Sequence, residues 1–96
     1  MGNKIKVKYF GQLRDIIGTK EEWLEIEEDL KLLDVLKRLN KKHGEAFEKF
    51  VFKRNNSLNE ILIFLINGVT ISTKDATDYL LKNEDTLSIL IPIFGG

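Results

Sequence analysis

The sequence predicts a single α+β domain in which one main helix packs across one face of a mixed β-sheet. Three observations support this fold class: period-two alternation near the N-terminus, helical spacing of apolar residues in the middle, and apolar strand-like runs in the last third. Ninety-six residues suffice for one domain with a single core. With 43% hydrophobic and 31% charged residues, the composition is that of a folded globular chain.

Residues 4–10 alternate with a period of two and predict a half-buried first strand. Its inward face carries Ile5, Val7 and Tyr9, while lysines occupy the outward face. Gly11 interrupts the alternation, so the strand is expected to end there.

A short helical turn over residues 12–17, closed by Gly18, is expected to lead into a second strand. Residues 23–27 alternate again, with Leu24 and Ile26 inward and a tryptophan and two glutamates outward. Antiparallel pairing would set the lysines of the first strand against these glutamates, each pair contributing about 0.2–1 kcal/mol. The charges therefore favour a hairpin with a long connection.

Helical spacing begins at Leu32. Apolar side chains at i, i+3, i+4 and i+7 predict an amphipathic helix through Leu32, Val35, Leu36 and Leu39. Gly44 is a suitable left-handed terminator, and the lone His43 is interpreted as a cation at the helix C-terminus, without the second ligand that a metal site needs. A shorter helical signal follows at Phe47, Phe50 and Val51.

The last third of the chain predicts strands again. Residues 61–66 form a continuous apolar run, typical of a strand with both faces at least partly covered, and Asn67-Gly68 predicts a tight turn into a short strand. Residues 73–78 are polar and predict a loop, and residues 86–91 predict the last strand. If the first and last strands lie side by side at the centre of the sheet, we expect them to run parallel.

The last strand leads into Pro92 and then into Gly95 and Gly96, which suggests a domain over residues 1–92 and a flexible tail over residues 93–96. Glycines without a Cβ fit a chain end that enters a narrow site on another protein, and four extended residues span about 13 Å. The functional group is then the α-carboxylate of Gly96, which is ionised at neutral pH. It needs prior activation, most simply as an acyl-adenylate made by a partner that holds ATP.

The charge balance and the lack of cysteine argue against several classes of function for this chain. Fifteen basic residues balance fifteen acidic ones, so no overall charge favours nucleic acid or an acidic membrane. The absence of cysteine excludes thiolate metal sites and thioester intermediates on this chain. Without a signal peptide or a membrane-length apolar run, a cytoplasmic location is expected. No acid–base pair, phosphate loop or activated nucleophile is visible, so we do not expect an enzyme in isolation.

Four stretches, at residues 8–15, 64–69, 82–87 and 92–96, together resemble the ubiquitin-like β-grasp sulfur carriers of the MoaD/ThiS type. They look like that family's opening strand and Leu-Arg turn, its Asn-Gly hairpin, and its final strand with the diglycine tail. The resemblance spans nearly the whole chain, and the tail is its most specific part. It implies a β-grasp fold of four to five strands with one main helix.

The resemblance also implies a function. A ubiquitin-activating-type ATPase would adenylate Gly96, and the carboxyl would then become a sulfur-donating thiocarboxylate; this chain itself would bind no cofactor. In the molybdopterin synthase small subunit, such a tail inserts into the large catalytic subunit. In small archaeal modifiers and the ubiquitin-related modifier, it also joins target lysines or serves tRNA thiolation. Molybdenum cofactor synthesis is the leading hypothesis, and a protein modifier or a binding-only β-grasp module are the alternatives.

The tail departs from the family pattern, because a single proline is followed by Ile93 and Phe94. Phe94 is a candidate anchor in a partner's groove. Leu90 shares the outward phase of Ser88, so Leu90 and Phe10 are candidates for an apolar docking patch. The alternative is that loops or helices cover both side chains.

Overall fold

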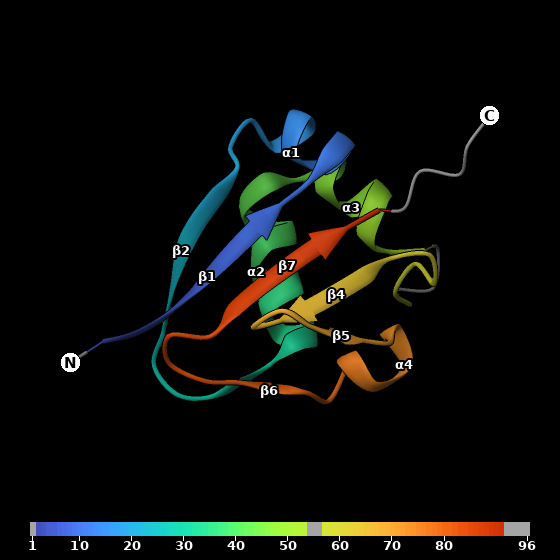
Figure 1. Cartoon of the computed structure of the whole chain (residues 1–96). Helices are drawn as coiled ribbons and strands as arrows, with labels where there is room; N and C mark the ends of the chain where they lie inside the picture. The colour runs from blue at the N-terminus through green and yellow to red at the C-terminus, as the bar shows by residue number, and fades with distance from the viewer. Residues whose placement is uncertain (1, 54–56, 92–96) are drawn as a thin grey trace.

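The computed structural model describes residues 2–53 and 57–91, which form a five-stranded mixed sheet with its helices gathered mainly on one face (Figure 1). This α+β arrangement is the predicted fold class. The predicted tail residues Phe94, Gly95 and Gly96 lie outside the described residues, so the division into residues 1–92 and 93–96 stays a prediction.

The strands are β1 (Asn3–Tyr9), β2 (Glu21–Ile26), β3 (Leu30–Lys31), β4 (Ile63–Ile66), β5 (Val69–Ile71), β6 (Leu80–Leu81) and β7 (Thr86–Leu90). The helices are α1 (Gly11–Ile17), α2 (Leu32–His43), α3 (Glu45–Val51) and α4 (Thr73–Ala76). The main sheet has the order β2-β1-β7-β4-β5, and β3 pairs with β6 in a separate two-stranded sheet.

Strands β1 and β7 lie side by side at the sheet centre and run parallel, as predicted, with Val7 opposite Leu87 and Tyr9 opposite Ile89. Strand β4 pairs antiparallel with the other edge of β7. In Figure 1 the arrowheads of β1 and β7 point the same way, toward the end of the sheet where α1 and α3 lie. The last strand therefore has hydrogen-bonded neighbours on both sides.

The predicted hairpin of β1 and β2 is confirmed, with lysines facing glutamates across the strands. Lys6 forms an ion pair with Glu21 at 3.1 Å. The Nζ atoms of Lys4 and Lys6 lie 4.5 and 4.9 Å from the ring centroid of Trp23, which stays 49% exposed. This half of the outer sheet face is thus a charged surface around one aromatic ring.

Helix α2 packs its apolar stripe against the inner face of the sheet, and all four predicted stripe residues are fully buried. They meet the inward residues of the central strands, among them Ile5, Val7, Phe64 and Ile89, in one contiguous core. The helix ends at His43, before Gly44 with a φ of 80°, and no side chain caps its start. The helical spacing of apolar residues in α2 and their alternation in the strands therefore determine which face of the helix packs against which face of the sheet.

The Asn67-Gly68 turn is also confirmed, with positive φ values of 52° and 85°. The Asn67 side chain ties this turn to the start of β7, because its amide donates to Asp85 and its oxygen accepts from the backbone N–H of Thr86. The β4–β5 hairpin is therefore fastened to the central strand at the end opposite Leu90.

The loop prediction for residues 73–78 was wrong over Thr73–Ala76, which forms α4. The Ser72 hydroxyl caps this helix by accepting from the backbone N–H of Asp75, and the spacing of the two residues is that of a capping motif. The pairing of β3 with β6 was not predicted, since strands of two residues carry no periodic signal.

Truncation of a core residue in α2 should destabilise the fold strongly. We expect Leu36→Ala, at a fully buried position, to lower the free energy of unfolding by about 2–5 kcal/mol, because it leaves a cavity under the sheet. Urea unfolding measures this change. The neighbouring exposed variant Lys37→Ala is the matched control and should change stability by less than about 0.5 kcal/mol.

Candidate functional site

The end of β7 is the candidate site, because it is the last described strand before the predicted tail. Ile89 lies between Tyr9 of β1 and Phe64 of β4, and Leu90 lies opposite Ile63. A strand paired on both edges cannot shift without breaking two ladders of hydrogen bonds. The position of Leu90 is thus fixed by the centre of the sheet.

Leu90 points to the outer face together with Ser88, as the sequence predicted. On β4, Ile63 and Leu65 lie opposite Leu90 and Ser88, and all four belong to the same face. We call this set, Ile63, Leu65, Ser88 and Leu90, the apolar half-face. Its three aliphatic side chains are half-buried and Ser88 is buried, and Figure 1 shows the helices on the opposite side of β4 and β7. The apolar half-face is therefore partly accessible beside the end of β7.

Phe10 follows directly on Tyr9, the partner of Ile89, and is 40% exposed at the N-terminus of α1. Ile61, two residues before Ile63, is 43% exposed. The structure thus leaves the Phe10 side chain exposed. Phe10 follows Tyr9 just as Leu90 follows Ile89, and Tyr9 and Ile89 are paired across the two strands. The sequence reasoning missed Ile61, Ile63 and Leu65, because a continuous apolar run does not tell which of its members stay accessible.

Below this end of the sheet, the carboxylate of Glu22 joins three elements. It accepts a hydrogen bond of 2.5 Å from the Tyr9 hydroxyl on β1. From the end of α2 it is contacted by Lys42 Nζ at 2.5 Å and by His43 Nε2 at 2.7 Å. The His43 ring also lies edge-on to Tyr9, with centroids 6.0 Å apart. The Glu22 network therefore holds the end of β1, the start of β2 and the end of α2 together.

The environment shifts the acidity of two members of this network. Burial alone would raise the pKa of Glu22, but the hydrogen bonds from Lys42, Tyr9 and His43 outweigh it and lower the pKa below its usual value. Burial, reinforced by the hydrogen bond and the charge of Glu22, raises the pKa of Tyr9 well above its usual value. Glu22 therefore stays charged and Tyr9 neutral across the physiological range.

The sequence placed His43 correctly at the helix C-terminus, where it was interpreted as a lone cation. The structure adds that its ring contacts the Glu22 carboxylate and that its side chain is only 17% exposed. Glu22 and Lys42 carried no signal of their own, because residues more than a dozen positions apart meet only when the strand and the helix pack. Among the described residues, no cluster of three or more potential metal ligands is found.

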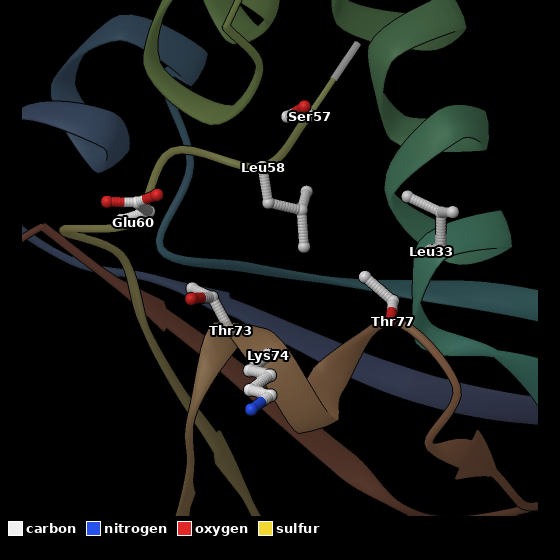
Figure 2. Close-up of a pocket in the computed structure, with 7 residues that line it drawn as sticks. All are labelled: Leu33, Ser57, Leu58, Glu60, Thr73, Lys74 and Thr77. Atoms are coloured by element: carbon white, nitrogen blue, oxygen red, sulfur yellow. The ribbon is translucent and has the colours of Figure 1, made fainter.

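A separate cavity of about 530 Å³ lies between α2, residues 57–60 and α4 (Figure 2). Leu33 and Leu58 face each other across it, with the hydroxyls of Thr73 and Thr77 on the α4 side. The described lining includes neither histidine nor cysteine, and none of it belongs to β1 or β7. This cavity therefore lies apart from the apolar half-face. Among the described helices, none is long and apolar enough to span a bilayer.

The fold and the end of β7 define a ubiquitin-like β-grasp protein. A sequence profile described as the ThiS family matches residues 7–96, and the chain belongs to this family of ubiquitin-like sulfur carriers. No curated protein sequence matches it significantly.

Solved structures agree with this assignment. The small archaeal modifier protein 1 of Methanosarcina acetivorans is 32% identical over 100% of this chain and 99% of its own, with a TM-score of 0.80. The modifier protein 1 of Haloferax volcanii is 25% identical over 97% and 99%, with a TM-score of 0.84. A putative molybdopterin converting factor subunit 1 from Pyrococcus furiosus is 30% identical over 95% and 99%, with a TM-score of 0.73.

Removal of the charge at Glu22 should make stability less dependent on pH. Because the folded-state pKa of Glu22 is lowered, its stabilisation is present above the ordinary glutamate pKa of about 4.3 and is lost as the pH falls through the folded value. We expect Glu22→Gln to lower unfolding free energy by about 1–3 kcal/mol at neutral pH, and by less in acid. Urea unfolding at several pH values measures this, with the exposed Glu27→Gln as control.

Proposed function

We propose that the protein carries sulfur as a thiocarboxylate at Gly96, after adenylation by a ubiquitin-activating-type ATPase. The observation that supports this most directly is the position of β7: the strand that precedes the diglycine sequence is the central strand of the sheet, and the apolar half-face lies beside its end. A rigid lead and an adjacent apolar surface are what a partner needs to take up a chain end in a defined register.

The proposed chemistry uses the terminal carboxylate of Gly96, which does not depend on an arrangement of side chains in the fold. The ionised carboxylate of Gly96 attacks the α-phosphorus of ATP on the partner, and pyrophosphate leaves. A sulfur nucleophile at the oxidation level of sulfide then attacks the carbonyl and displaces AMP, which leaves a thiocarboxylate. Neither step needs a nucleophile from this chain, which has no cysteine to form a thioester. Gly95 keeps the approach to the carbonyl free of side chains.

In this proposal the acceptor of the sulfur is a molybdopterin precursor held by the large subunit of molybdopterin synthase. The similarity to a putative molybdopterin converting factor subunit 1 supports this assignment. The similarity to small archaeal modifier proteins supports a second candidate, in which Gly96 forms an isopeptide bond with a target lysine or serves tRNA thiolation. Both candidates share the adenylation step and differ in the nucleophile that follows.

Loss of Gly96 should abolish sulfur loading. In protein isolated from the native host, we expect intact mass spectrometry to find a species heavier by the exchange of one oxygen for sulfur, and this species should disappear on deletion of Gly96. Gly2→Ala is the control, because Gly2 is exposed and an added Cβ would meet no neighbour. Branched peptides carrying the Gly96 carboxyl on a lysine, without that species, would favour the modifier; normal function of the deletion variant would contradict both.

Phe10 should contribute to docking of the activating partner, and Leu90 with it. We expect Phe10→Ala to slow ATP–pyrophosphate exchange by the native host's activating ATPase about tenfold, a loss of about 1.4 kcal/mol in binding. Ile16→Ala on α1 is the matched control, because Ile16 is 38% exposed and Phe10 is 40% exposed. Equal rates for the two variants would remove Phe10 from the docking surface.

A further inference from the structure

The two edges of the main sheet differ in how they are covered. At the β2 edge, the Arg38 guanidinium on α2 donates a hydrogen bond of 3.0 Å to the backbone oxygen of Glu25, and the Thr19 hydroxyl donates one of 3.0 Å to the backbone oxygen of Glu21, so side chains of the same chain occupy two carbonyls of this edge. The other edge is β5, whose single neighbour in the sheet is β4. An uncovered edge strand offers unpaired backbone groups to another chain. Among the described residues, no side chain hydrogen-bonds to the backbone of β5, so the β5 edge is the more open of the two for strand pairing.

The register shows which backbone groups face outward from β5. Ile66 and Val69 flank the two-residue turn and form the hydrogen-bonded pair that closes it. In an antiparallel ladder the next pair, Leu65 with Thr70, is a non-hydrogen-bonded pair. The N–H and C=O of Thr70 consequently point away from β4, toward the open edge, and Thr70 is exposed.

A groove of about 570 Å³ runs beside this edge and is lined by β5, the end of β4, Asp75 of α4 and Tyr79. Its apolar lining comes from Ile66, Val69, Ile71 and Tyr79. Val69 is 65% exposed and Tyr79 is 37% exposed, and both belong to the small set of large apolar side chains that the described chain leaves accessible. The groove can thus take an apolar side chain from a strand paired with β5.

Asp75 gives the groove a charge. It is the single ionisable carboxylate among the described lining residues, and no lysine or arginine lines the groove with it. Its Oδ2 accepts a hydrogen bond from the Ser72 hydroxyl at 3.2 Å, which fixes the carboxylate at the start of α4. The neighbouring Lys74 lines the cavity of Figure 2 instead. The charge of the groove therefore complements a cation.

We propose that the open edge of β5 binds an extended segment of a partner protein that carries an apolar and a basic residue at alternate positions. Backbone pairing with Thr70 holds the segment, the apolar side chain enters the groove between β5 and Tyr79, and the basic side chain meets Asp75. Alternate residues of a strand share one face, so both side chains reach the groove together.

This surface is separate from the one used by the proposed sulfur carrier. Strand β4 lies between β5 and β7, and the turn at Asn67-Gly68 is at the end of the hairpin opposite Leu90. A partner strand on β5 therefore leaves the apolar half-face and the end of β7 free. The chain can hold one partner at the β5 edge while another acts at Gly96.

The test is an NMR titration of the ¹⁵N-labelled full chain with a short acetylated peptide that alternates Val and Lys with Thr and Ser. We expect shifts at the amides of Thr70, Asp75 and Tyr79, and weaker binding of the same peptide with Glu in place of Lys. Asp75→Asn should reduce the preference for the Lys peptide about two- to fivefold, as for an exposed ion pair. Asp78→Asn, at an exposed position outside the groove, is the matched control.

Thr70→Pro tests the backbone pairing separately. Proline on an edge strand removes the outward N–H of Thr70 and leaves the bonds to β4 in place, so the variant should fold and lose binding of the Lys peptide. Absence of shifts at β5, shifts confined to β2, or equal affinity for the Lys and Glu peptides would overturn the proposal. Concentration-dependent dimerisation of the free protein that Thr70→Pro abolishes would also overturn it, because a second copy would then be the occupant.

Discussion

The parallel pairing of β1 with β7 at the centre of the sheet is the contact on which the other features depend. It joins the two ends of the described chain, and the inward residues of both strands lie in the core under α2. Parallel neighbours must be connected through the rest of the domain. Hence α2, the β4–β5 hairpin and the short elements between them all serve to return the chain to a position beside its first strand.

The central place of β7 also divides the outer face of the sheet. On one side, β1 and β2 present lysines and glutamates around Trp23. On the other side, β7 and β4 present the apolar half-face, with Ile63 opposite Leu90. A partner that recognises the end of β7 thus meets an apolar surface bordered by charges of both signs. This arrangement suits a specific, reversible contact, because the charges select orientation while the apolar area supplies affinity.

The Glu22 network shows how much of the site's support comes from packing. The Tyr9 side chain is buried at the end of β1, and its buried hydroxyl needs a hydrogen-bond partner. Glu22 supplies that partner and is itself contacted by Lys42 and His43. Because Phe10 follows directly on Tyr9, the network that holds Tyr9 in place also restricts the backbone position of Phe10.

The sequence by itself determined the α+β class, the four stripe residues of α2 and the hairpin at Asn67-Gly68, because each is written in local periodicity or in a local turn requirement. It also identified the diglycine sequence ending at Gly96 as the candidate reactive end. Only the tertiary structure decided that Ile63 and Leu65 join Leu90, that His43 pairs with Glu22, that Ser72 starts a helix, and that β5 keeps an open edge. These features arise between segments far apart in the chain or from the competition of short segments, and local patterns do not encode them.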